Sequence, residues 1–198
     1  MTEQFQNQEK LEINAFVDNT IVESSLEFDQ VDLQDVEVHL EKIADRQRQI
    51  TAKIPIPYPI EKVWKVVTDY DSLADFIPNL AKSTRLPHPN GGIRLEQIGS
   101  QRFLNFNFCA RVVVDLVENF PKEISFYMIE GDFKNFSGCW RLESCNLGEV
   151  TGTTLTYTIS VLPRFAIPIS IIERRLSHDL QSNLLAIRQR VGELAIGM

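Results

Sequence analysis

Apolar and polar residues alternate along most of the chain beyond residue 35, a pattern typical of strands with one buried face. The alternation predicts about seven strands, over residues 49–56, 81–86, 93–99, 106–119, 123–130, 136–145 and 153–162. A further strand over residues 36–41 would pair with the first of these as a hairpin. Short turns such as PHPNGG at 87–92 join neighbouring strands, so the sheet should be antiparallel.

Two stretches follow the period of a helix instead. Apolar residues stand at spacings 0, 3, 4 and 7 from Ile60, which places them on one helix face. The segment SLAD, starting at Ser72, resembles a capping box and predicts a second, very short helix that Pro78 ends. Apolar residues within 172–194 fall in an arc of about 120°, which predicts a long amphipathic helix with Asp179 outside the stripe.

These elements predict an α+β fold. A curved antiparallel sheet of about seven strands would wrap around the long C-terminal α-helix, with two short helices after the first strand. The apolar stripe of the long helix needs an apolar partner, so it should cover one face of the sheet. A strongly curved sheet that grips a helix often leaves a cavity. The segment DYDSLADFIPNL, residues 69–80, would then form its lip, because Phe76 and Ile77 are unusually apolar for a loop.

Charge divides the chain into two parts. Residues 1–35 carry nine acidic residues against one basic residue, a net charge of −8, whereas the rest has a net charge of +1. This first segment lacks periodicity and is expected to be a disordered acidic tail, with the folded domain over residues 36–198. The acidic total of −7 argues against a nucleic-acid binder, which usually carries a basic excess.

Candidate chemistry is sparse along the chain. The three cysteines show no CxxC spacing, and the three histidines stand on different predicted elements, so no metal and no cofactor are expected. No serine or cysteine nucleophile has an evident base, and no catalytic residue is assigned.

Targeting signals are also lacking in the sequence pattern. The start MTEQFQNQEK is not that of a signal peptide, and no stretch approaches the roughly 20 apolar residues of a membrane span. We therefore expect a cytoplasmic protein, with transient membrane contact through Phe165, Ala166 and Ile167.

Three segments resemble a known family. They are IPIPYPIEKVWKVVTDYDSLADFIPNL at 54–80, EGDFKNFSGCWRLES at 130–144 and RRLSHDLQSNLLAIRQRV at 174–191. Together with the strand order they resemble the START-like, SRPBCC superfamily, in its polyketide cyclase/dehydrase and coenzyme Q-binding group, over about residues 47–194. The resemblance implies a helix-grip fold with a central apolar cavity. Members bind or move lipids, quinones, sterols or aromatic polyketides, and some catalyse reactions in that cavity.

Aromatic, sulfur-containing and aliphatic residues supply the candidate site. The candidate ligand-binding residues, in the cavity or at its gate, are Phe76, Ile77, Pro78, Phe126, Met128, Trp140, Tyr157, Leu176 and Leu180. For Phe126, Met128, Trp140 and Tyr157 the pattern fits a solid core and a cavity wall equally well. The resemblance favours the cavity wall.

Three functions remain open from the sequence. The main hypothesis is a non-catalytic binder or carrier of a hydrophobic small molecule, such as a lipid, isoprenoid or quinone. Its ligand would exchange through a gate at residues 76–78 against the start of the long helix. The alternative is a cyclase or dehydratase-type enzyme acting on an aromatic or polyketide-like substrate, with Arg94, Glu96 or Tyr157 as acid or base. The pattern does not fix which face Arg94 and Glu96 occupy. The third hypothesis is an interaction protein, in which the acidic tail docks a protein partner that the sequence does not identify.

Overall fold

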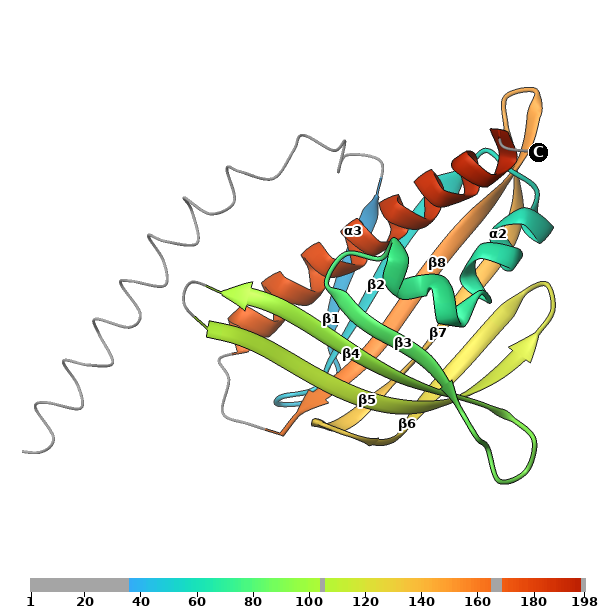
Figure 1. Cartoon of the computed structure of the whole chain (residues 1–198). Helices are drawn as coiled ribbons and strands as arrows, with labels where there is room; N and C mark the ends of the chain where they lie inside the picture. Colours follow the sequence, from blue (N-terminus) through green and yellow to red (C-terminus); the bar gives the residue numbers. More distant parts are fainter. Residues whose placement is uncertain (1–35, 104–105, 165–168, 197–198) are drawn as a thin grey trace, which may run out of the picture. The chain divides into compact units, whose positions relative to one another are not determined.

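A computed structural model of the chain describes residues 36–103, 106–164 and 169–196 (Figure 1). Within this part the chain forms one eight-stranded antiparallel sheet and three helical segments. The strands are β1 (Glu37–Lys42), β2 (Arg48–Ile56), β3 (Leu80–Leu86), β4 (Ile93–Phe103), β5 (Phe106–Asn119), β6 (Glu123–Gly131), β7 (Phe133–Leu147) and β8 (Val150–Pro163). The helical segments are α2 (Ile60–Val67), the 3-10 helix η2 (Tyr70–Asp75) and α3 (Ile169–Ile196).

The predicted α+β fold, a curved sheet with one long C-terminal helix, is confirmed. The sheet has eight strands rather than about seven because β1 extends it beyond β2, so α2 and η2 follow the second strand. The predicted acidic tail, residues 1–35, and the predicted membrane-contact segment, residues 165–167, lie outside the described residues. Among the described helices, none combines the length and the apolar character that crossing a bilayer requires.

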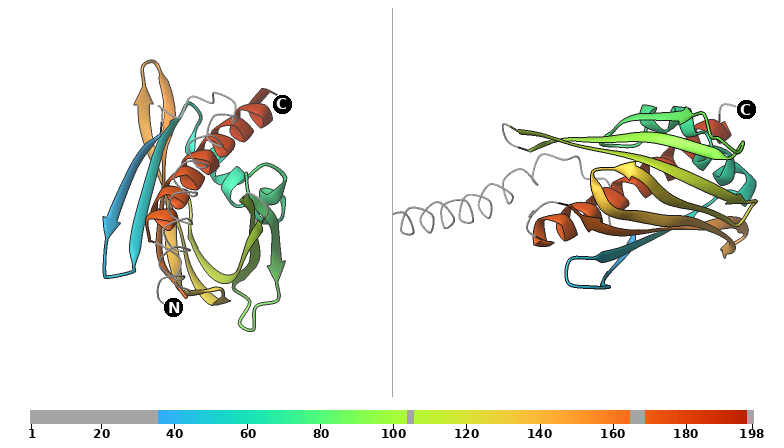
Figure 2. Two further views of the ribbon diagram at one scale, coloured as in Figure 1. Left: turned by 90° about the vertical axis from the view of Figure 1, so that its left-hand side faces the viewer. Right: turned by 90° about the horizontal axis from the view of Figure 1, so that it is seen from below.

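The sheet curls strongly along its strand order, β1-β2-β8-β7-β6-β5-β4-β3. The left-hand view in Figure 2 shows the two limbs of the curled sheet, with α3 running along the limb that contains β1 and β2. The main contacts of α3 are with β2, α2, β1 and β8, whereas η2 lies against β3. The helix therefore covers one limb of the sheet, and β3 to β6 curve round to face it from the other side.

The apolar stripe of α3 supplies much of the core. Leu180, Leu184, Ile187 and Val191 are each at most 2% exposed, which agrees with their helical spacing. At the first turns of α3, Glu173 accepts a hydrogen bond from Nε of Arg48 on β2. The same guanidinium donates through Nη1 to three backbone carbonyls of the β1–β2 turn. Arg48 therefore joins the beginning of α3 to the sheet.

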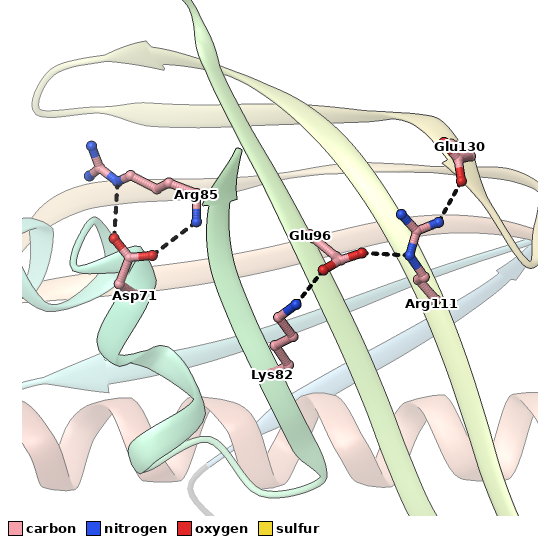
Figure 3. Close-up of polar contacts among 6 residues, drawn as sticks. All are labelled: Asp71, Lys82, Arg85, Glu96, Arg111 and Glu130. Atoms are coloured by element: carbon pink, nitrogen blue, oxygen red, sulfur yellow. Dashed lines mark hydrogen bonds and ion pairs between the residues drawn. The ribbon is translucent and has the colours of Figure 1, made fainter. Parts of the chain in front are cut away.

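The short helix η2 begins earlier than expected and without the predicted capping box. It starts at Tyr70 instead of Ser72, and the preceding Asp69 makes no side-chain cap. Asp71 instead accepts a hydrogen bond from the backbone N–H of Arg85, at 2.9 Å, so its carboxylate is used to bind β3 (Figure 3). The hydroxyl of Tyr70 donates to Glu118 of β5 at 2.6 Å. These two contacts hold η2 against the sheet.

Ion pairs cross the outer, convex face of β3, β4 and β5 (Figure 3). Glu96 accepts hydrogen bonds from Nζ of Lys82 at 2.5 Å and from Nε of Arg111 at 2.6 Å, and Arg111 also donates to Glu130 at 2.5 Å. The hydrogen bonds from Lys82 and Arg111 lower the pKa of Glu96. We call these four residues the outer ionic ladder. It joins four neighbouring strands from outside the cavity.

A second polar cluster surrounds Asp115, which is only 5% exposed although it lies on the same outer face. Arg94 donates to both of its oxygens, at 2.6 and 2.8 Å, and Nε2 of His88 lies 3.2 Å from the carboxylate. Nδ1 of His88 accepts the backbone N–H groups of Asn90 and Gly92. Hydrogen bonds from Arg94, together with the weaker contribution of His88, lower the pKa of Asp115. The cluster therefore anchors the β3–β4 turn to β5.

Asp115→Asn should make the stability of the fold less dependent on pH in acid. Because the folded-state pKa of Asp115 is lowered, its contribution is complete above the unfolded-state value of about 3.9 and is lost as the pH falls below it. Urea unfolding midpoints measured between pH 7 and pH 3 should therefore fall more steeply for the natural sequence than for the variant. Asp69→Asn, at an exposed carboxyl, is the control. Parallel curves for the natural sequence and Asp115→Asn would contradict this account.

Candidate functional site

A cavity of about 300 Å³ lies between the concave face of the sheet, η2 and α3. The inward residues of β4 and β5 that line it are Leu95, Gln97, Gly99, Ala110, Val112, Val114 and Leu116. Because side chains alternate across a strand, Arg94 and Glu96 project from the opposite face. The volume lies at the lower end of the range for small-molecule sites, about 300–1,000 Å³. The space is therefore large enough for a compact ligand.

One wall of the cavity is aromatic. It is formed by side chains from β6, β7 and β8, namely Phe126, Phe133, Phe136, Trp140 and Tyr157. The rings of Trp140 and Tyr157 are stacked, with centroids 3.6 Å apart and planes inclined by 7°. The ring of Phe126 is tilted against that of Phe136, with centroids 5.6 Å apart. Together these rings give the wall extended flat apolar surfaces.

The segment after η2 forms an edge of the cavity. Ile77, Pro78, Asn79 and Leu80 line it, and Pro78 and Asn79 are exposed, so the cavity reaches the protein surface beside them. Asn79 has a φ of 61°, the left-handed conformation that asparagine adopts more readily than most residues. This residue turns the chain from η2 into β3.

Most of the candidate residues lie along the cavity, and two do not. Those on the wall or the edge are Ile77, Pro78, Phe126, Trp140, Tyr157, Leu176 and Leu180. Phe76 and Met128 are not among the lining residues, and both pack against the core. The guanidinium of Arg190 lies 5.8 Å from the ring centre of Phe76. Phe76 therefore lies near the last third of α3, whereas Ile77 and Pro78 line the same cavity as Ile172 and Leu176 at the start of that helix. A role in ligand binding stays a prediction for every one of these residues.

Polar groups in the cavity were largely missed by the sequence analysis. Gln97 lines it from β4 and donates to Ser83 at 3.3 Å, and α3 contributes Arg175, Asp179 and Asn183. Asp179 was expected outside the apolar stripe but borders the cavity. Asn183 stands seven residues after Leu176, so the two lie about 20° apart around the helix axis. A polar residue within the apolar stripe is the sequence signal that could have identified this position.

The residues considered for acid–base catalysis do not converge in the cavity. Arg94 and Glu96 belong to the outer face, where Arg94 pairs with Asp115 and Glu96 with Lys82 and Arg111. Tyr157 does line the cavity, and burial raises the pKa of its phenol, so the hydroxyl stays protonated at neutral pH. The enzyme hypothesis therefore loses Glu96, its best candidate, and retains a neutral phenol.

Other features of the described residues add no further chemistry. No group of three or more His, Cys, Asp or Glu side chains in the described ranges is arranged to hold a metal ion. A smaller hollow of about 190 Å³ between α2 and the end of α3 is lined in part by exposed charged residues, including Lys62, Lys65 and Glu193. We regard the larger cavity as the candidate site because aromatic and aliphatic side chains enclose it.

Solved structures similar to this chain share its fold at low sequence identity. A protein of Thermus thermophilus is 19% identical with a TM-score of 0.63, and the match covers 76% of this chain and 99% of that one. The STAR-related lipid transfer protein of Xanthomonas axonopodis is 16% identical with a TM-score of 0.61, and the match covers 81% of this chain and 96% of that one. The Zhui aromatase/cyclase of a Streptomyces species is 17% identical with a TM-score of 0.59, and the match covers 74% of this chain and 94% of that one. At these identities the likeness concerns the fold.

Sequence comparison assigns the family. A search among curated proteins returned no significant match. The profile of the family described as polyketide cyclase / dehydrase and lipid transport, in contrast, matches residues 56–188, which is more than half of the chain. The matched region extends from the end of β2 into the last third of α3 and so includes most of the cavity. This chain therefore belongs to the polyketide cyclase/dehydrase and lipid transport family.

Proposed function

We propose that the domain binds a hydrophobic small molecule, such as a lipid, isoprenoid or quinone, in the cavity and carries it without changing it chemically. The observation that supports this most strongly is the cavity lining, in which aliphatic and aromatic side chains predominate. Removing apolar surface from water is favourable by about 25 cal/mol per Å². A ligand of this kind would therefore gain most of its binding free energy from leaving water.

The carrier proposal is preferred to the enzyme proposal because Glu96, the best acid–base candidate from the sequence, lies on the outer face. The family description and the neighbouring structures include both lipid transport and aromatase/cyclase proteins, so they support either. A cyclase or dehydratase needs an acid or base within hydrogen-bond reach of its substrate. Here Glu96 is engaged by Lys82 and Arg111 on the outer face, and its lowered pKa disfavours a role as a general acid.

The edge formed by residues 76–79 is proposed as the gate. Pro78 and Asn79 are exposed beside the cavity, and Ile77 lines it, so a ligand entering here would cross little polar surface. The cation–π contact between Arg190 and Phe76 would hold the gate against α3.

Native mass spectrometry of the freshly purified full chain should detect a bound apolar molecule, which organic extraction would then release and identify. The rate of ligand release can then be measured by exchange of the recovered ligand. Phe76→Ala should release the ligand several-fold faster than the natural sequence does, because the contact with Arg190 is lost. Gln189→Ala, an exposed neighbour on α3, is the matched control. Protein that purifies without ligand and binds no lipid, isoprenoid or quinone would contradict the carrier proposal. Unchanged release from Phe76→Ala would contradict the gate alone.

A further inference from the structure

Asn183 has an unusual environment on the cavity side of α3. Its Oδ1 atom is fully buried and no described residue donates a hydrogen bond to it. Among the described residues, it is the only buried side-chain oxygen or nitrogen without a partner. The residue lines the cavity together with Leu176, Leu180 and Ile187 of the same helix. Asp179, one turn earlier on α3, also borders the cavity, so the amide lies on a wall that is mostly but not wholly apolar.

The unpaired oxygen of this amide is a cost to the isolated fold. A buried carbonyl without a donor is destabilising, and the great majority of buried polar atoms in folded proteins have a partner. A leucine would continue the apolar stripe of α3 without that cost. The other amide on the wall, Gln97, differs because its Nε2 donates to Ser83 at 3.3 Å. The contrast marks Asn183 as the amide whose oxygen has no partner within the described part of the protein.

We propose that Asn183 accepts a hydrogen bond from a hydroxyl group of the ligand, so that the natural ligand is a hydrophobic alcohol or phenol. This inference rests on the proposed function and narrows its ligand class. A hydroxyl group can donate to Oδ1 and also accept from Nδ2 of the same amide, whereas a ketone can only accept. A carboxylate cannot donate to Oδ1 either.

The test compares two ligands that differ only in the group meant for Asn183. 1-Naphthol and 1-methylnaphthalene are similar in size and shape, and the first carries a hydroxyl where the second carries a methyl group. Dissociation constants for both are measured on the full chain, on Asn183→Leu and on Ile187→Leu. Ile187→Leu is the matched control, since it alters the same wall one turn further along α3 and leaves the amide in place. Asn183→Ala supplies the same comparison with no added bulk if Asn183→Leu does not fold.

The informative quantity is the preference for 1-naphthol, which is the dissociation constant of 1-methylnaphthalene divided by that of 1-naphthol. We expect this preference to be about five- to tenfold greater in the natural sequence than in Asn183→Leu or Asn183→Ala, which is the range for one hydrogen bond. Ile187→Leu should keep the preference of the natural sequence. An equal preference in all the proteins overturns the role of Asn183 while leaving the cavity proposal intact. If the natural sequence bound neither compound, the proposal that the cavity accepts ring-sized apolar ligands would be overturned. The inference about Asn183 would then be overturned as well.

Discussion

Replacing Gly138 with alanine should destabilise the fold by about 3 kcal/mol, because β7 has no room for a Cβ atom at this position. An added Cβ would lie 2.1 Å from the carbonyl oxygen of Thr158 and 2.7 Å from the ring of Phe126. The first neighbour is backbone of β8 and cannot rotate away, so the strand pairing itself would have to shift. For a chain of this size the thermal midpoint should fall by roughly 6–12 °C, measurable by circular dichroism.

Gly99→Ala is the control for that experiment. Gly99 also lies within a strand and lines the cavity, but its added Cβ would come no closer than 3.8 Å to another atom. This variant should keep a thermal midpoint close to that of the natural sequence. Equal destabilisation by both substitutions would show that the loss comes from replacing any strand glycine, and the close approach at Gly138 would not be its cause.

Ala110→Phe should weaken binding of the apolar ligand by roughly tenfold or more while leaving the protein folded. Ala110 lines the cavity from β5, so the added ring would occupy space that the ligand needs. Because that ring would be buried among apolar side chains, the thermal midpoint should change little. Binding of the ligand recovered from the purified protein, measured by calorimetry, together with a thermal melt, separates the two effects.

Val117→Phe adds the same ring to the same strand on its other face. Val117 is 61% exposed and lies outside the cavity, so this variant should bind ligand as the natural sequence does. If Ala110→Phe retained full affinity, the ligand would have to bind elsewhere on the protein. Loss of affinity in both variants would indicate a general effect on β5 instead of a filled cavity.

The main elements could be predicted because their periods were clear. The spacing from Ile60 predicted α2, and the alternation over residues 153–162 predicted β8, with Leu155, Ile159 and Val161 buried. The short helix was less certain because a capping box is a local signal. In the fold Asp71 accepts a hydrogen bond from the backbone N–H of Arg85 on β3, 14 residues further along the chain, and a four-residue capping pattern does not reveal this partner.

The site was harder to predict for two physical reasons. In β4, Leu95 faces the cavity but Ile98 stands on the other face, so apolar residues alone could not decide the direction of Arg94 and Glu96. Asp115 on β5 fixes that direction for Arg94, and only the register of the two strands brings them together. Asn183 could have been noted as a polar residue within an apolar stripe, but its lack of a partner depends on the packing around it.

The outer ionic ladder has a consequence for how this protein could diversify. Lys82, Glu96 and Arg111 hold β3, β4 and β5 together from the convex side, away from the ligand space. Substitutions at inward positions of the same strands, such as Gln97 and Ala110, would therefore reshape the cavity without removing those links. Selection for a new cargo would then act on one surface of the sheet while the opposite surface preserves the architecture.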